Sequence, residues 1–154
     1  MTTTLQDRKV IVFNLNGEEY AVPVQNVGSI ERMMQITRVP KTEHFIKGVI
    51  NLKGVVTPIV DLRVRFGTDR REYDDSTRII IVYYREMEIG LVVDGANDVI
   101  DIPEDAIEPP PEVINTVHAD YIEGVAKMGN RLLVLLDLEK VLDKKENDYL
   151  KLEA

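Results

Sequence analysis

Residues 45–62 read FIKGVINLKGVVTPIVDL and join two short β-branched runs through a turn at Lys53-Gly54. A pair of this kind tolerates the positive φ angles of a tight hairpin turn. Pro58 cannot donate a hydrogen bond to a strand ladder, so it predicts a strand end or an edge. Asp61 follows the second run and is a good N-cap. The stretch therefore predicts a hairpin that leads into a short helix.

Three further hairpins are predicted along the chain, because short β-branched runs between turn residues are typical of many short strands. A longer helical signal opens at Asp137 and places apolar and long side chains on one face. It predicts a C-terminal amphipathic helix. The hairpins are Val10–Leu15 with Tyr20–Val24, Ile79–Tyr84 with Glu88–Val93, and Gly124–Met128 with Arg131–Leu136; the helical face is Leu138, Val141, Leu142, Lys145 and Tyr149.

The second half of the chain repeats the first. Residues 8–31 align without a gap on 77–100, and 45–66 align on 121–142. Strand-rich segments can resemble one another by composition alone, but here an aromatic, a glycine and an aspartate match at one offset. We expect one domain, 1–154, with pseudo-repeats at about 8–67 and 77–143. Because each copy carries about five short strands, the sequence predicts a mainly β fold of two small barrels packed together.

Composition excludes several classes of protein. The 154 residues contain no cysteine, which removes disulfides and thiolate metal sites and fits a reducing compartment. The formal charge of -8, with scattered Lys and Arg, disfavours a nucleic-acid partner. No apolar run approaches the roughly 20 residues that cross a bilayer, and Met1–Asp7 lacks the features of a signal peptide. We expect a cytoplasmic protein without direct membrane insertion.

No catalytic constellation is recognisable in the sequence. His44 and His118 lie far apart, with no second histidine near either one, which disfavours a metal site. Asp61 and Asp137 each follow a strand and precede a helix, so they read as helix caps rather than as a general acid and base. The sequence therefore predicts a protein that is not an enzyme and has no cofactor or metal. Its chemistry is expected at apolar surfaces that bind other proteins.

Residues 45–62 resemble the CheW family of chemotaxis coupling proteins, and the resemblance covers nearly the whole chain. It continues through Ile89–Asp94, Asp98–Ile100, Tyr121–Gly124 and Arg131–Leu133. The resemblance implies two five-stranded SH3-like β-barrels around a shared hydrophobic core, with short helices including a C-terminal one. It also implies an adaptor that couples the cytoplasmic tips of methyl-accepting chemoreceptors to the regulatory domain of the histidine kinase CheA, recruited to membrane receptor arrays.

The same resemblance implies two binding surfaces. The receptor-binding groove comprises Val27, Ser29, Ile30, Lys53, Ile89, Ala96 and Val99, and the kinase-binding surface comprises Met33, Met34, Ile36 and Val113. This chain departs from the family at Lys53, where arginine is usual, and at Ser29, often acidic in the family. Because an ammonium lacks the planar fork of arginine, the polar part of receptor recognition is in question.

Two other interpretations stay open. One is a related binding module, either the scaffold that joins this domain to a phosphoacceptor receiver or the kinase's own regulatory domain. The chain shows neither a receiver nor an ATP-binding segment, which favours a stand-alone adaptor. The other is a small β-barrel enzyme with its site in the seam between the two units.

Overall fold

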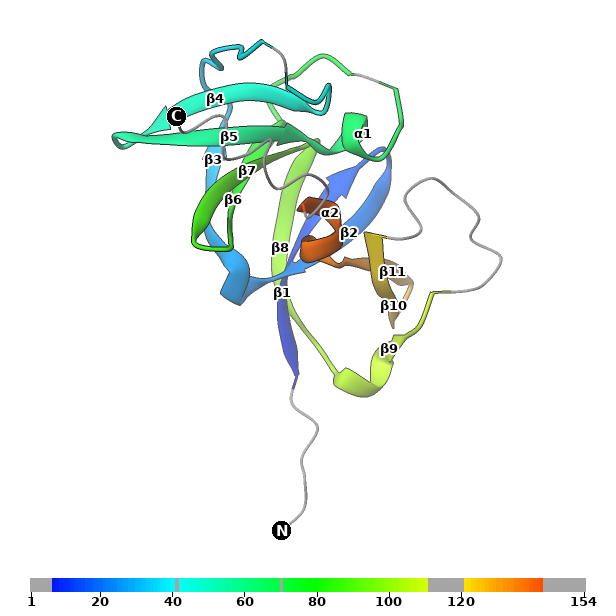
Figure 1. The fold of residues 1–154 in the computed structure, drawn as a ribbon. Coiled ribbons are helices and arrows are strands. Elements are labelled where there is room, and N and C mark those ends of the chain that lie inside the picture. The colour runs from blue at the N-terminus through cyan, green and yellow to red at the C-terminus, as the bar shows by residue number, and fades with distance from the viewer. Residues whose placement is uncertain (1–6, 41, 70, 111–120, 143–154) are drawn as a thin grey trace.

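The computed structural model describes residues 7–40, 42–69, 71–110 and 121–142, and these form a mainly β fold (Figure 1). Two mixed, mostly antiparallel sheets lie against each other, and the helices are short. One sheet has the order β3-β6-β7-β5-β4, and we call it unit 1; the other has the order β8-β1-β2-β11-β10-β9, and we call it unit 2. The prediction of a mainly β protein with two SH3-like units is confirmed.

The strands of unit 1 are β3 (Val27–Arg32), β4 (Ile46–Leu52), β5 (Val55–Asp61), β6 (Arg78–Tyr84) and β7 (Met87–Val93). Those of unit 2 are β1 (Arg8–Leu15), β2 (Glu18–Pro23), β8 (Gly95–Ile102), the two-residue β9 (Ile107–Glu108), β10 (Ile122–Met128) and β11 (Arg131–Leu136). The helices are α1 (Leu62–Arg65) and α2 (Leu138–Leu142), with 3-10 turns η1 (Val24–Asn26) and η2 (Glu104–Ala106). Lys145 and Tyr149, placed on the terminal helix by the sequence, lie outside the described residues.

The two units exchange hairpins, which the repeat in the sequence did not predict. Hairpin β1–β2 from the first half of the chain joins β8–β11, and hairpin β6–β7 from the second half joins β3–β5. Each unit joins the two copies through one parallel and one antiparallel pairing. These are β5 with β7 and β3 with β6 in unit 1, and β2 with β11 and β1 with β8 in unit 2. Each unit therefore contains strands of both copies, and neither copy forms a unit with its own strands alone.

Three apolar clusters hold this arrangement together. The largest lies between the two sheets and contains Phe13, Tyr20, Val60, Phe66 and Leu91 among its buried members. A smaller cluster fills each unit, around Ile59 and Ile79 in unit 1 and around Val12 and Leu133 in unit 2. Because alternate residues of a strand face opposite sides of the sheet, each strand contributes to the shared core with one face and to its own unit with the other.

The hairpin turns and helix caps read from the sequence are present. Lys53 and Gly54 both have positive φ, at 53° and 88°. Asp61 caps α1, since its Oδ1 accepts hydrogen bonds from the backbone N–H groups of Arg63 and Val64 at 3.0 and 3.4 Å. At Pro58, β5 pairs with β4, and its pairing with β7 begins one residue later, so the missing N–H interrupts no ladder.

The aromatic that opens the second half of each copy meets its counterpart at one buried arginine. The guanidinium of Arg65 lies 4.6 Å from the ring centroid of Phe45 and 4.8 Å from that of Tyr121. Its Nε donates to the carbonyl oxygen of Val141 at 2.7 Å. Arg65 is buried, so these cation–π contacts are shielded from water and are stronger than exposed ones. Arg65 thus links α1 of unit 1 to the second half of the chain.

Candidate protein-binding surfaces

Two exposed aliphatic residues extend the shared core to the surface. Ile30 on β3 is 41 % exposed and Val99 on β8 is 55 % exposed. Ile30 is paired with Ile80 and Val99 with Ile11, and both partners are buried members of the shared core. Directly paired residues point to the same side of a sheet, so Ile30 and Val99 lie on the core-facing sides of the two edge strands. The junction between the units therefore carries apolar surface from both.

Three other residues predicted for the receptor groove lie on the same two edge strands. Val27 is partly buried against the shared core, and Ser29 is partly buried one residue before Ile30. Ala96 is partly buried on β8 and is paired with Phe13. Strands β3 and β8 are end strands in their sheets, so each pairs on one side only. Ser29 is paired with Ile81 of the unit 1 interior, so it faces the other side of β3. Val27, Ile30, Ala96 and Val99 form a strip along the two sheet edges, which we call the junction surface.

The two remaining groove residues are placed differently. Ile89 is 0 % exposed and belongs to the shared core, so the prediction that its side chain lines a surface groove is wrong. It is apolar and lies in the middle of an inner strand, β7, which is what buries it. Lys53 is exposed at the tip of the β4–β5 hairpin, on the strand pair at the other edge of unit 1 from β3.

The residues predicted for kinase binding form a pocket at one end of unit 1. Met33, Met34 and Ile36 follow β3 and pack partly buried against the interior cluster of that unit. With Arg38, Lys47 and Tyr73 they line a cavity of about 320 Å³. Their apolar side chains are thus half inside and half open to a cavity, rather than on a flat exposed turn. Val113 lies outside the described residues.

A carboxylate of the β7–β8 corner ties three segments of the chain together. Arg63 donates from Nε and Nη2 to the two oxygens of Asp94 at 2.9 and 2.7 Å, and the backbone N–H of Asn16 donates to the same carboxylate at 2.8 Å. Burial by itself raises the pKa of Asp94, but the hydrogen bonds from Arg63 and Asn16 outweigh it and hold the pKa below its usual value. Asp94 is therefore a structural anion and not a free acid.

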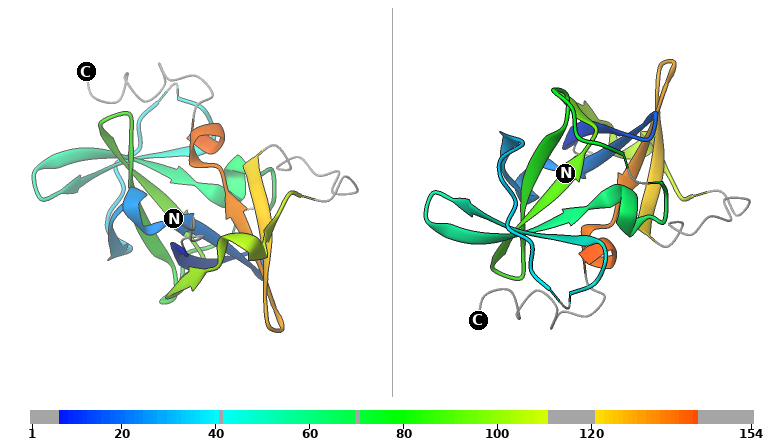
Figure 2. Two further views of the ribbon diagram at one scale, coloured as in Figure 1. Left: turned by 90° about the horizontal axis from the view of Figure 1, so that it is seen from below. Right: turned by 90° about the horizontal axis from the view of Figure 1, so that it is seen from above.

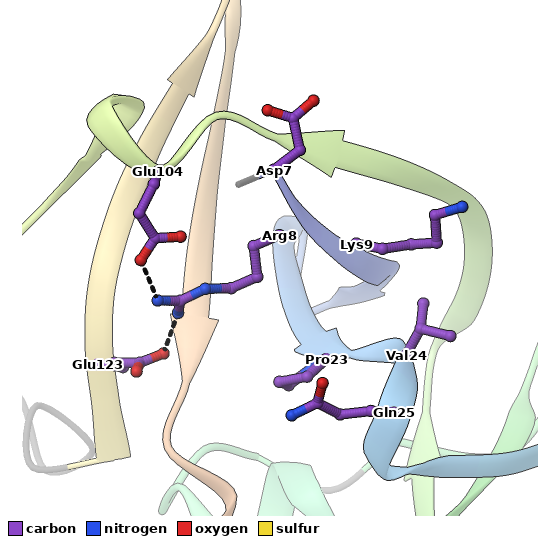
Figure 3. A pocket seen from close by; sticks show the side chains of 8 residues that line it. All are labelled: Asp7, Arg8, Lys9, Pro23, Val24, Gln25, Glu104 and Glu123. Atoms are coloured by element: carbon purple, nitrogen blue, oxygen red, sulfur yellow. Dashed lines mark hydrogen bonds and ion pairs between the residues drawn. The ribbon is translucent and has the colours of Figure 1, made fainter. Parts of the chain in front are cut away.

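The corresponding end of unit 2 has a different, polar pocket of about 750 Å³. Arg8 crosses it and donates from Nη2 to Glu104 and from Nη1 to Glu123, both at 2.8 Å, as Figure 3 shows. Burial tends to lower the pKa of Arg8, and the two carboxylates raise it above its ordinary value. The three charges at the centre of this pocket, one guanidinium and two carboxylates, are thus paired within the chain.

Several exposed apolar residues were missed by the sequence reasoning. Tyr83 on β6 is 50 % exposed, and Val55, Val56 and Leu132 at the hairpin strands are about as exposed. The repeat could have identified two of these residues, because Val56 and Leu132 occupy equivalent positions in the two copies. Both lie beside a hairpin turn, where the strands extend beyond the hydrophobic core.

Groups that could bind a metal ion are not found in the described part of the chain. His44 is exposed and makes an edge contact with the Phe45 ring, at 6.1 Å between ring centroids. Among the described residues, no helix is long and apolar enough to span a membrane.

Comparison with known proteins identifies the family to which this chain belongs. The profile of the CheW-like domain matches residues 9–146, which is most of the chain. The chain belongs to the CheW-like domain family. The chemotaxis protein CheW of Bacillus subtilis (strain 168) is 50 % identical over 139 residues, covering 90 % of this chain and 89 % of that protein. The chemotaxis protein CheW of Klebsiella aerogenes is 39 % identical, covering 90 % and 84 %.

A solved structure shares the fold of this CheW-like chain. The scaffolding protein TtCheW from Thermoanaerobacter tengcongensis superposes with a TM-score of 0.83 at 36 % sequence identity, covering 90 % of this chain and 94 % of that one. The resemblance read from residues 45–62 is thereby confirmed. The family, the fold and the named relatives together assign this chain a scaffold role in chemotaxis.

Proposed function

We propose that this CheW-like chain is a non-catalytic adaptor that couples chemoreceptor tips to the histidine kinase CheA. The observation that carries the proposal is the pair Ile30 and Val99, two exposed aliphatics on the core-facing sides of different units. An apolar strip between two units suits the apolar face of a helical hairpin, which is the form of the receptor tip in this family. The adaptor would act in the cytoplasm, at receptor arrays.

The receptor surface in this proposal is the junction surface, comprising Val27, Ile30, Ala96 and Val99. Ser29, on the other side of β3, and Lys53, at the β4–β5 tip, are separate polar positions of the proposed contact. Ile89 is left out because it is buried. The kinase surface is the pocket of Met33, Met34 and Ile36 at the end of unit 1, with Val113 as a further position outside the described residues. Two separate surfaces allow both partners to bind at once, as coupling requires.

The test is a binding assay with a purified receptor-tip fragment and the kinase's regulatory domain, separately and together. Ile30→Asp and Val99→Asp are each expected to weaken receptor binding by about tenfold or more, because they place a charge in a desolvated apolar contact. Lys53→Ala is expected to weaken it less. Kinase binding should change little in all three variants.

Leu132→Asp is the matched control, since Leu132 is 54 % exposed and aliphatic like Val99. It lies in the β10–β11 hairpin of unit 2, which projects away from β3, the strand of Ile30 (Figure 2). Equal losses of receptor affinity in Leu132→Asp and Ile30→Asp would count against the junction surface. Failure of the parent protein to bind either partner would sink the adaptor proposal, and a small molecule held tightly at the junction would favour the enzyme interpretation.

A further inference from the structure

The residues of the junction surface are spaced in a way that a regular strand does not allow. Val27 and Ile30 are three positions apart on β3, and Ala96 and Val99 are three positions apart on β8. Because side chains of a regular strand alternate between its two sides, residues three apart point to opposite sides. Here all four face the shared core. Their ladder partners are buried members of that core, in the same order Val82, Ile80, Phe13 and Ile11.

A β-bulge in each edge strand accounts for this spacing. On β3, the pairing with β6 shifts register before Ser29 and leaves Gly28 without a partner in the ladder. On β8, the pairing with β1 shifts before Asp98 and leaves Asn97 without one. A bulge inserts one extra residue and changes which side the following residues face. The two bulges lie at equivalent positions of the repeat, and each one turns the next aliphatic residue of its strand toward the junction surface.

Polar side chains hold the bulge of β8. Asn97 and Asn14 form a reciprocal pair, in which each amide nitrogen donates to the amide oxygen of the other, at 3.1 and 2.8 Å. The Nδ2 of Asn97 also donates to Glu19 at 3.2 Å. Arg131 donates to Glu19 at 2.8 Å and to Asp98, the next residue of β8, at 3.3 Å. The extra residue and the one after it are thus bound to side chains of β1, β2 and β11.

These bonds select one of two registers of an edge strand. If the bulge moved past Asp98, that residue would take the place of Val99 opposite Ile11 and would face the junction surface. β8 is an end strand and pairs on one side only, so fewer ladder bonds hold its register than hold that of an inner strand. The move would break the contact of Asp98 with Arg131 and place a carboxylate among apolar side chains. The bonds around Asn97 therefore keep an apolar residue at the junction surface.

We propose that the side chains around Asn97 position the junction surface for the receptor tip. Asn14 and Arg131 fix the bulge so that Val99, and not Asp98, meets the partner. The inference rests on the proposed receptor contact and goes beyond it, since it assigns residues that act through β8. Because a slip exchanges an apolar contact for a charge at one edge strand, loosening the bulge weakens receptor binding while the shared core changes little.

Tyr83 has the same role for the bulge of β3. Its ring covers Gly28, where an added Cβ would lie 2.8 Å from the tyrosine hydroxyl, and in the repeat it takes the place of Asn14. A ring packed on glycine makes a close contact that a larger residue would prevent. Tyr83→Phe keeps the ring and should retain the parent's receptor affinity, whereas Tyr83→Ser should weaken receptor binding by roughly fivefold.

The experiment measures receptor-tip affinity, kinase-domain affinity and urea unfolding for the full chain and its variants. Asn97→Ala is expected to weaken receptor binding by roughly fivefold, with kinase binding and the unfolding midpoint nearly unchanged. Asn14→Ala breaks the same amide pair, so the double variant should bind the receptor about as weakly as Asn97→Ala. Asn130→Ala is the matched control, because Asn130 is an exposed asparagine at the β10–β11 turn; it should change the affinity by less than about twofold.

Two further measurements separate positioning from a general loss of structure. The difference in receptor affinity between the parent and Arg131→Ala should close at about 1 M sodium chloride, because salt screens the exposed ion pairs of Arg131. The difference for the uncharged change Asn97→Ala should persist. In methyl NMR, the cross-peak between Val99 and its neighbour Ile11 should weaken in Asn97→Ala, while cross-peaks elsewhere in the core stay as in the parent.

The outcomes separate this inference from the proposed function. An Asn97→Ala variant that binds the receptor tip as tightly as Asn130→Ala, or that keeps the full Val99–Ile11 cross-peak, overturns the inference and leaves the adaptor proposal standing. Equal losses of receptor and kinase binding in Asn97→Ala also overturn it, because they report damage to the whole chain. Absence of receptor binding by the parent overturns the receptor arm of the proposed function, and the cross-peak alone then decides whether these side chains hold the bulge.

Discussion

The ends of the two units that lie farthest from the cavities above are closed in different ways. In unit 2, Arg131 donates to both oxygens of Glu19 at 2.8 and 3.1 Å and reaches Asp98 at 3.3 Å. Asn14 and Asn97 hydrogen-bond to each other beside this cluster. The strands β1, β2, β8 and β11 are thereby joined by polar side chains on one face of the sheet.

In unit 1 three of the five equivalent positions differ in kind, whereas Glu19 corresponds to Glu88 and Asp98 to Ser29. By the repeat, Arg131 corresponds to Val55, Asn14 to Tyr83 and Asn97 to Gly28. The Tyr83 ring lies over Gly28, where an added Cβ would be 2.8 Å from the tyrosine hydroxyl. One duplicated position is thus closed by ions and amides in unit 2 and by an aromatic ring over glycine in unit 1. Duplication has thus preserved the backbone of the two units while the chemistry of these two ends has diverged.

The largest expected effect concerns Gly48 and its counterpart Gly124, where the two units are most alike. A Cβ at Gly48 would clash with the carbonyl oxygen of Thr37, and the residue has a φ of 145°; at Gly124 the Cβ would lie 2.7 Å from the carbonyl oxygen of Glu108. We expect Gly48→Ala to lower the free energy of unfolding by about 3 kcal/mol, and Gly124→Ala by less, because Gly48 has both the closer clash and the positive φ. Urea unfolding measures both. Equal losses would show that neither the closer clash nor the positive φ at Gly48 adds to the cost.

The second-largest expected effect concerns Arg65, which contacts Phe45 and Tyr121, equivalent residues of the two copies. Arg65→Ala removes two buried cation–π contacts and the hydrogen bond to the Val141 carbonyl, with an expected loss of about 2 kcal/mol in the free energy of unfolding. Arg85→Ala is the control, since Arg85 contacts the ring of Tyr84 and forms an exposed ion pair with Glu139 at 3.8 Å. It should cost well below 1 kcal/mol. A similar loss in the two variants would mean that burial at the junction adds nothing.

Asp94 offers a test by pH. Its pKa is lowered in the folded protein, so the stability it contributes is present above the unfolded pKa of about 4 and is lost as pH falls through the folded value. Asp94→Asn should cost about 1.5 kcal/mol at pH 7 and progressively less below pH 4. Thermal unfolding at pH 7 and at pH 3 measures the difference between parent and variant. A difference that stays constant with pH would contradict the assigned role of the carboxylate.

The smallest effect is expected at the polar cluster of unit 2. Arg131→Ala should cost less than about 1 kcal/mol, since its ion pairs are exposed and screened by salt. The hydrogen bond from Arg131 lowers the pKa of Glu19, so the loss should shrink both in high salt and as pH falls below about 4. Denaturant unfolding with and without 1 M sodium chloride provides the measurement. Tyr83→Ser at the equivalent end of unit 1 should show no such salt dependence, and if it did, the two closures would not differ in kind.

Much of the fold followed from local sequence features. The turn at Lys53-Gly54 and the Asp61 cap each depend on residues within a few positions of one another, so their chemistry is readable along the chain. The family resemblance was likewise recognised from residues 45–62, which include this turn and this cap. Met33, Met34 and Ile36 were recognised as an apolar group, but the structure decided that they form the floor of a pocket with Arg38 and Lys47.

The tertiary structure decided what depends on pairing between distant segments. The parallel contacts of β2 with β11 and of β5 with β7 join residues far apart in the sequence, and no local pattern specifies them. Together with the antiparallel pairings of β3 with β6 and of β1 with β8, they exchange the hairpins between the copies, bury Ile89 and leave Ile30 and Val99 exposed at the sheet edges. The sequence by itself determined the four hairpins, the helix caps and the family, because local chemistry encodes them, but it did not identify β3, β8 or β9. Which apolar residues became core and which became surface was decided only when both halves packed together, since burial is a property of the assembled sheets.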